Sequence, residues 1–412
     1  MFNISMVIYS PGMDPFSIYL HIPFCQHRCG YCDFNTYAGL ESIIPRYVDA
    51  LCQEIQFLSR TVETPLPVHT IFFGGGTPSL LPPNELEKIF QTLNAVFSLQ
   101  SGLEVTLEAN PGTLSPAYLS DLRSLGVNRL SLGVQSAHPE ELLLLERQHD
   151  YLDVIHAVTW ARQAGFDNLN LDLIFGLPGQ ELQAWQGTLN LALGLHPQHV
   201  SLYALSVEHG TPLSHWVGRG LLSDPDPDVQ ADMYEWASER LDRAGYAQYE
   251  ISNWGNRNRN DDILACQHNL QYWRNKSYIG FGAGAHGFAS RVRTANVLAP
   301  GTYIQRLTQA PDGSTRPELR FPRTPATQAF QPVDQQTEIG ETMMMGLRLT
   351  REGVTRSTFM ERFGLDLEEY FRKEIVELVA YGLLEWAGEG NEILRLTPKG
   401  RLLGNQVFMR FI

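Results

Sequence analysis

The 412-residue sequence predicts an α/β protein whose larger part is a partial barrel of the TIM type, with six βα units. Two observations lead to this prediction. Between residues 17 and 207, short apolar or alternating segments recur between segments with helical periodicity. Several helical segments begin with proline, which suits the first helical position because the amide there has no helical partner. Repeated βα units predict a parallel sheet covered by helices.

The six predicted strands are rich in Ile, Val, Leu, Phe or Tyr, and they span 17–22, 69–73, 104–109, 129–135, 168–175 and 199–206. The helices predicted to follow them span 45–59, 83–97, 116–125, 139–146, 151–163 and 182–195. Six units are fewer than the eight of a complete barrel, so we expect an open one. In such folds the chemistry lies at the carboxyl ends of the strands, and motifs at those ends are candidates for a site.

After this core, predicted at 1–210, the regular alternation fades. We expect a connecting region at 211–308, with one amphipathic helix at 224–244. A stretch rich in Pro, Thr and Gln at 309–336 predicts a linker.

The tail at 337–412 is predicted to be a small winged-helix-like domain. Three helical patterns precede a predicted β-hairpin at 382–400, and they span 337–347, 355–363 and 367–381. The tail contains twelve acidic residues against ten Lys and Arg. A basic surface for DNA is therefore not expected, and a structural or partner-docking role is favoured.

Composition narrows the class of protein further. The formal net charge of −14 disfavours binding to nucleic acid. With 43% hydrophobic and 18% charged residues, the chain is typical of a packed globular protein. It shows neither the charged start and apolar core of a signal peptide nor 18 consecutive apolar residues. We expect a cytoplasmic protein, with peripheral membrane contact left open.

Three of the five cysteines lie close together directly after the first predicted strand. Cys25, Cys29 and Cys32 form the pattern C-x3-C-x2-C within YLHIPFCQHRCGYCDF. Thiolates are soft, strong metal ligands, and closely spaced thiolates on a loop can hold one centre. Structural zinc remains an alternative, because His21 or His27 could complete four ligands. An iron–sulfur cluster held by three cysteines would instead leave one iron open.

Further motifs follow the later predicted strands. They are GGGTP at 74–78, Glu108 in EANP, GVQS at 133–136 followed by Arg147, and Asp172 in DLIFGLPG. Glycines permit close approach of a ligand to the backbone, and a carboxylate can accept hydrogen bonds from ribose hydroxyls. An Asp inside an apolar strand is costly unless it is paired or used. Arg147 as a structural partner of Asp172 remains an alternative.

With these motifs at successive strand ends, the chain resembles the radical S-adenosylmethionine (SAM) superfamily. The resemblance implies a [4Fe–4S] cluster on Cys25, Cys29 and Cys32, whose open iron chelates SAM and whose reduction cleaves SAM to a 5′-deoxyadenosyl radical. The positions that match SAM-contacting residues of the family are Tyr19, Tyr31, Gly75, Gly76, Thr77, Glu108, Gln135, Arg147 and Asp172.

A closer resemblance is to the oxygen-independent coproporphyrinogen III oxidases and the related HemW-type haem chaperones. It rests on HIPFC-x3-C-x2-CDF, GGGTP, GVQS, DLIFGLPG and a late HN-x2-YW. In the oxidase branch two SAM molecules bind, and Gln135, Arg147 and Asp172 would contact the second. Phe34 stands where the oxidases carry a fourth cysteine. This difference, the short start and HN-x2-YW favour the chaperone branch.

The resemblance implies that haem is a ligand. His268 is the predicted haem ligand, because imidazole coordinates haem iron well, and Tyr272 and Trp273 would flank the porphyrin. Cys266 and His286 are competing ligand candidates. The alternative that this stretch is a structural loop with packed aromatic side chains also stays open.

The expected function is that of a haem chaperone that passes haem to acceptor proteins such as respiratory enzymes, with an electron donor for the cluster. Coproporphyrinogen III oxidation, by radical decarboxylation of propionates, is the main alternative. A zinc-stabilised adaptor is a third. Whether SAM is cleaved and whether the chain forms a homodimer remain open at this point.

Overall fold

The computed structural model describes residues 14–258, 260–309 and 319–412, and the chain divides into two compact units. Unit 1 consists of Met1–Gln198, Leu202–Met233 and Ser277–Pro332. Unit 2 consists of His199–Ser201, Tyr234–Lys276 and Val333–Ile412. Nearly all of the core predicted at 1–210 therefore belongs to unit 1.

The six predicted strands all form, as β1 (Phe16–Ile22), β4 (Pro67–Gly75), β5 (Ser98–Ala109), β6 (Arg129–Gln135), β7 (Leu169–Phe175) and β8 (His199–Ala204). The strands β1, β4, β5, β6 and β7 pair in that order, each parallel to the next, and β8 follows β7 in the sheet. The predicted parallel βα array is confirmed, and its carboxyl ends meet at one edge.

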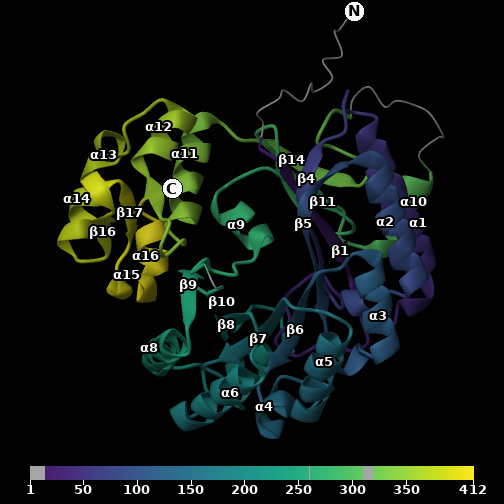
Figure 1. Ribbon diagram of the computed structural model, residues 1–412, viewed down its shortest axis with the longest axis horizontal. Coiled ribbons are helices and arrows are strands. Elements are labelled where there is room, and N and C mark those ends of the chain that lie inside the picture. The colour runs from purple at the N-terminus through teal and green to yellow at the C-terminus, as the bar shows by residue number, and fades with distance from the viewer. Residues whose placement is uncertain (1–13, 259, 310–318) are drawn as a thin grey trace, which may run out of the picture. The chain divides into compact units, whose positions relative to one another are not determined.

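The helices between these strands are α1 (Ile44–Ser59), α2 (Pro83–Val96), α3 (Pro116–Leu125), α4 (Pro139–Leu144), α5 (Tyr151–Gln163) and α6 (Leu182–Gly194). The helices α1, α2, α3 and α5 run along the outer side of the strands (Figure 1). Proline occupies the first turn of α1 to α4, as predicted. The helix α1 buries an apolar stripe that includes Val48, Leu51 and Ile55. The short elements of this unit are β2 (Phe24–Cys25), β3 (Tyr37–Ala38), η1 (Glu41–Ile43), η2 (Pro78–Leu80) and η3 (Pro111–Thr113).

The sheet of unit 1 extends beyond the predicted strands. β11 (Tyr278–Phe281) pairs parallel with β1, and β12 (His286–Ala289), β13 (Val292–Asn296) and β14 (Thr327–Pro332) continue it antiparallel. These strands, with α7 (Pro212–Gly218) and α10 (Pro300–Thr308), lie in the regions predicted as connection and linker. Local sequence patterns do not show which distant strand a segment pairs with. The linker residues 310–318 lie outside the described residues.

A buried carboxylate fixes this extension to α1. Glu54 is fully buried and accepts hydrogen bonds from the Gly282 amide (2.9 Å), Asn296 Nδ2 (2.9 Å), the Tyr303 hydroxyl (2.6 Å) and the Thr324 hydroxyl (2.7 Å). Burial raises the pKa of Glu54, and these donors oppose the rise. One side chain thus accepts hydrogen bonds from the end of β11, from β13 and from α10.

Unit 2 contains helices followed by a hairpin, as predicted for the tail. The hairpin strands β16 (Leu384–Ala387) and β17 (Ile393–Leu396) pair antiparallel, and β15 (Val354–Thr355) adds to β17. Its apolar core includes Met343, Phe359 and Leu378. The remaining elements are β9 (Tyr246–Glu250), β10 (Asn253–Asn256), α9 (Gln267–Trp273), α11 (Gln335–Gly346), α12 (Arg356–Phe363), α13 (Leu367–Tyr370), α14 (Arg372–Ala380), η4 (Glu389–Asn391), α15 (Pro398–Leu402) and α16 (Gly404–Phe408).

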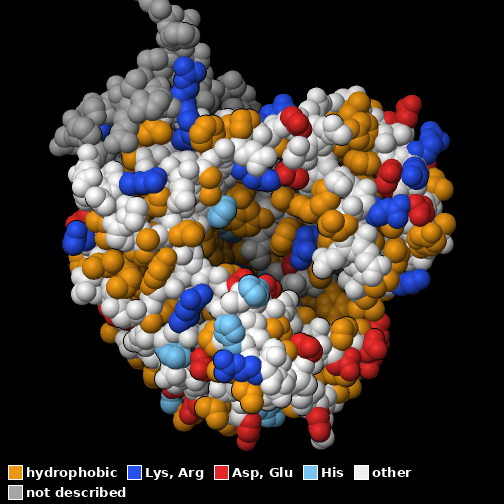
Figure 2. Space-filling model, turned by 180° about the vertical axis from the view of Figure 1, so that it is seen from behind, with side chains coloured by type: hydrophobic (Ala, Val, Ile, Leu, Met, Phe, Trp, Pro, Cys, Tyr) orange, Lys and Arg blue, Asp and Glu red, His pale blue; other side chains and the backbone are white. Residues whose placement is uncertain are grey.

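The predicted amphipathic helix at 224–244 forms as α8 (Pro227–Arg243). Within the part of the chain that the structure describes, no helix has the length and apolar character needed to cross a membrane. On the face drawn in Figure 2, Lys and Arg side chains are scattered among Asp and Glu. No dense basic patch is seen on that face.

Candidate functional site

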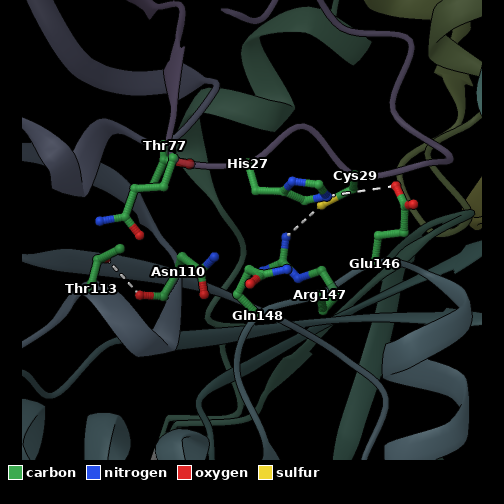
Figure 3. Close-up of a pocket in the computed structure, with 9 residues that line it drawn as sticks. His27, Cys29, Thr77, Asn110, Thr113, Glu146, Arg147 and Gln148 are labelled. Carbon is green, nitrogen blue, oxygen red and sulfur yellow. Dashed lines mark hydrogen bonds and ion pairs between the residues drawn. The ribbon is translucent and has the colours of Figure 1, made fainter. Parts of the chain in front are cut away.

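A pocket lies in unit 1 where several of the predicted motifs meet (Figure 3). Its walls come from the cysteine loop after β1, the glycine motif after β4, the turn after β5 and the segment after α4. The lining residues are Gln26, His27, Cys29, Thr77, Asn110, Thr113, Glu146, Arg147 and Gln148. The expectation that strand-end motifs converge holds for these segments.

The three cysteines of the loop influence one another. Cys25 is buried in β2, whereas Cys29 and Cys32 are partly buried. Burial raises the pKa of Cys25, and the neighbouring thiols of Cys32 and Cys29 raise it further. The Thr77 hydroxyl donates to Cys25 Sγ at 3.6 Å, and Arg147 Nη1 donates to Cys29 Sγ at 3.6 Å. Donors of this kind stabilise thiolates.

The donor set fits a cluster with three protein ligands. Among the described residues, no group of three or more His, Cys, Asp or Glu side chains converges closely enough to hold a single metal ion. In an iron–sulfur cluster each thiolate binds a different iron, so the sulfurs need not converge on one point. Both histidines considered as zinc ligands have other partners. His21 Nδ1 lies 3.0 Å from the Tyr19 hydroxyl, and His27 Nε2 lies 3.6 Å from Glu146.

The glycine motif is packed against the chain that leaves β1. Gly75 has a φ of +113°, and a Cβ there would lie 2.6 Å from His21 Cε1. A Cβ at Gly76 would lie 2.6 Å from the Phe24 carbonyl oxygen. The Gly76 amide donates to Ile22 O at 2.8 Å. Glycine is therefore required here for close approach, and the motif supports the residues just before Cys25.

A group of acidic and phenolic side chains lies beside the glycine motif. Glu108 accepts a hydrogen bond from the Gly75 amide at 3.1 Å. Burial, and then the negative charge of Asp172, raise the pKa of Glu108 to about 8. Asp172 itself accepts from the Ser131 hydroxyl at 2.8 Å. Burial, and then the charge of Glu108, raise the pKa of Tyr19. These groups would bind the hydroxyls of a polar ligand.

Arg147 and Gln135 lie together over Gly133. A Cβ at Gly133 would lie 3.0 Å from Gln135 Nε2 and 3.2 Å from Arg147 Nη2. Gln135 has a φ of +67°. Arg147 Nη2 donates to Gly133 O at 2.8 Å, while its buried Nε has no hydrogen-bond partner among the described residues. A buried guanidinium nitrogen without a partner fits a site whose ligand supplies the acceptor.

Tyr31 completes the set of predicted SAM-contacting residues. Burial raises its pKa, and the charges that act on it come from Arg147, Cys29, Cys32 and Asp172. The structure thus brings the predicted residues of unit 1 into one region. Asn110 and Glu146 also line the pocket, although neither was predicted as a site residue. Their positions next to quoted motifs were the available signal.

The predicted haem residues lie together on α9 in unit 2. His268 is 1% exposed, and its Nε2 lies 2.9 Å from the Tyr272 hydroxyl. The guanidinium of Arg348 lies 4.5 Å from the ring centre of Trp273. The three side chains are therefore packed within unit 2 in this conformation. Of the competing ligands, Cys266 is fully buried and His286, on β12 of unit 1, is exposed.

Comparisons with known proteins agree with this arrangement. The family model of the radical SAM superfamily matches residues 19–192, and that of the HemN C-terminal domain matches residues 333–403. The heme chaperone HemW of Bacillus subtilis is 38% identical over 96% of this chain and 99% of its own length. That of Escherichia coli is 35% identical over 97% of this chain and 99% of its own length.

A solved structure shows the same fold. Coproporphyrinogen III oxidase (HemN) from Escherichia coli, described as a radical SAM enzyme, is 23% identical and superimposes with a TM-score of 0.80. The match covers 99% of this chain and 91% of that one. The fold, the two matched domains and the relatives of 35% and 38% identity over nearly their full length lead to one conclusion. The chain belongs to the HemW family of the radical SAM superfamily.

Proposed function

We propose that the protein is a haem chaperone built on a radical SAM scaffold. The observation that carries the proposal is the similarity to proteins named heme chaperone HemW, which extends through both units. It is supported by the three-cysteine loop beside a polar pocket. The protein would bind haem and pass it to acceptor proteins such as respiratory enzymes, working in the cytoplasm with an electron donor.

Cys25, Cys29 and Cys32 would hold a [4Fe–4S] cluster with one iron left open for SAM. When bound, the two cofactors supply one-electron reductive chemistry. The Glu108 carboxyl group would form hydrogen bonds with ribose hydroxyls, as its place beside the Gly75 amide permits. Tyr19, Tyr31, Gly76 and Thr77 would complete this contact, and Gln135, Arg147 and Asp172 would bind a second SAM or extend the first site.

Haem coordination by His268 carries a structural requirement. Its Nε2 would have to leave the Tyr272 hydroxyl, and α9 would have to open, because the imidazole is 1% exposed. Haem titrations of His268→Ala, Cys266→Ala and His286→Ala test the three candidates. Loss of the haem spectrum in one variant alone identifies the ligand. An unchanged spectrum in His268→Ala removes that residue.

One anaerobic experiment tests the function as a whole. The wild-type chain is reconstituted with iron and sulfide, titrated with haem, and assayed with SAM, a low-potential reductant and coproporphyrinogen III. Stoichiometric haem binding, haem transfer to an apo-acceptor and no porphyrinogen turnover are expected. Robust formation of protoporphyrinogen IX would establish an oxidase instead. Stoichiometric zinc without iron would support a zinc-stabilised adaptor.

Cys25→Ala separates the cofactor sites. It should abolish cluster binding, because two thiolates remain where three are needed. Haem binding should persist if the two sites are independent. Iron analysis and the haem absorption spectrum measure both in one preparation, and joint loss would show that they are one site.

A further inference from the structure

The cluster loop, defined as residues 25–32, is held firmly at its start. The Thr77 amide donates to Phe24 O at 2.8 Å, and the Thr77 hydroxyl donates to Cys25 Sγ at 3.6 Å. Cys25 itself is buried. This first anchor comes from the glycine motif and the adjoining strands.

The rest of the loop runs from exposed residues to partly buried ones, with one buried residue between them. Gln26, His27 and Arg28 are exposed, while Gly30 is buried. The Gly30 carbonyl accepts a hydrogen bond from the Leu213 amide at 2.9 Å. Leu213 is the second residue of α7, and amides in the first turn of a helix have no partner within it. The amide is therefore free to hold the cluster loop.

Side chains of α7 reinforce this hydrogen bond. A Cβ at Gly30 would lie 3.2 Å from Trp216 Cη2 and 3.0 Å from Glu146 Oε2. Leu213 is 1% exposed within an apolar cluster, and both Trp216 and Tyr31 pack against that cluster. The segment that joins Cys29 to Cys32 therefore contacts both α7 and the turn after α4.

We propose that α7 is the second anchor of the cluster loop and that Trp216 is a positioning residue for Cys29 and Cys32. The proposal rests on the proposed cluster at these cysteines. Two of its three thiolates, those of Cys29 and Cys32, flank the Gly30 carbonyl that α7 holds, and Arg147 adds a second contact at Cys29 Sγ. Groups that orient metal ligands typically change metal affinity about 10- to 100-fold when they are removed.

The test compares Trp216→Ala with two matched variants. Trp160→Ala removes another half-buried tryptophan from a helix of unit 1, away from the loop. Trp216→Phe keeps an aromatic ring in place. Each reconstituted protein is challenged with an iron chelator, and cluster loss is followed by absorbance. The EPR spectrum of the reduced cluster and the melting temperature of the apo-protein are recorded in parallel.

Trp216→Ala should lose its cluster about tenfold faster than Trp160→Ala, with an altered EPR line shape, and Trp216→Phe should restore most of the wild-type rate. Gly30→Ala should behave like Trp216→Ala, because the added methyl group pushes against the retained tryptophan ring. It replaces Trp216→Ala in the test if that variant does not fold. Equal rates in Trp216→Ala and Trp160→Ala, with a cluster present in the wild type, would overturn the anchor. A wild-type chain that binds no cluster would overturn the proposed function instead.

Discussion

Replacing Glu54 with Ala should strongly destabilise unit 1. The carboxylate is fully buried and accepts hydrogen bonds from Gly282, Asn296, Tyr303 and Thr324. No sequence motif marks Glu54, yet β11, which ends just before Gly282, pairs with β1 at Tyr19. The variant therefore tests whether a distant carboxylate supports the candidate site.

The structure allows the magnitude to be estimated. The hydroxyls of Tyr303 and Thr324 and the side-chain amide of Asn296 each lose one hydrogen bond, although Asn296 Nδ2 keeps a second one, to Gly282 O at 3.0 Å. The Gly282 amide would lose its carboxylate acceptor inside the core, at a cost of about 1–3 kcal/mol. Three further lost hydrogen bonds cost about 1 kcal/mol each. The expected loss is about 4–6 kcal/mol, a large part of the stability of a typical domain.

Urea denaturation followed by circular dichroism measures this loss from the shift of the midpoint. Glu54→Gln is the matched control, since its amide oxygen still accepts some of these hydrogen bonds while its NH₂ group faces the remaining donors. It should lose less than Ala. SAM affinity should also fall in Glu54→Ala, because Tyr19 loses the support of β11. A loss of stability below about 1 kcal/mol would refute the reasoning.

Two further predictions concern the site itself. Burial raises the pKa of Glu108 from 4.5 to about 8, so the folded chain keeps a proton that the unfolded chain releases. The contribution of Glu108 to the free energy of unfolding should therefore be fully present below about pH 4.5 and fall as the pH rises to about 8. In Glu108→Gln the free energy of unfolding should change less with pH over this range. An identical pH dependence in the variant and the wild type would contradict the raised pKa. Gly75→Ala should cost about 2 kcal/mol or more and weaken SAM binding by calorimetry, because its Cβ would meet His21 at a φ of +113°. Gly102→Ala is the control, with a φ of +81° and nothing within 4 Å of the new Cβ, and equal losses in the two variants would show that strain alone is responsible.

Much of unit 1 could be predicted from the sequence, because the information there is local. A buried parallel strand is a short apolar run, and a covering helix shows a 3.6-residue period. Both signals are read within about 15 residues. The sheet extension β11–β14 escaped prediction, since its strands are short, β11 and β12 contain glycine, and the link of β11 to β1 spans most of the chain.

The predicted haem residues, which lie on α9, illustrate a different limit of prediction from sequence. The sequence marks His268, Tyr272 and Trp273 through the HN-x2-YW motif, but it does not show that they lie on one short helix or what they touch. Only the structure reveals that His268 lies against Tyr272 and that Arg348 covers Trp273. Arg348 lies far from Trp273 in the sequence, and the burial of His268 depends on the folded unit, so spacing alone could not separate a ligand from a packed side chain.

By itself, the sequence determined the parallel βα core, the three-cysteine loop and the placing of motifs at strand ends. These features follow from local periodicity and from the chemistry of residue types. Only the tertiary structure decided that Glu54 holds β11 to α1, that Glu108 carries a raised pKa beside Asp172, and that α7 contacts Gly30. Burial, charge proximity and hydrogen bonding between distant segments arise only when the chain is folded, because each depends on distances that no linear spacing specifies.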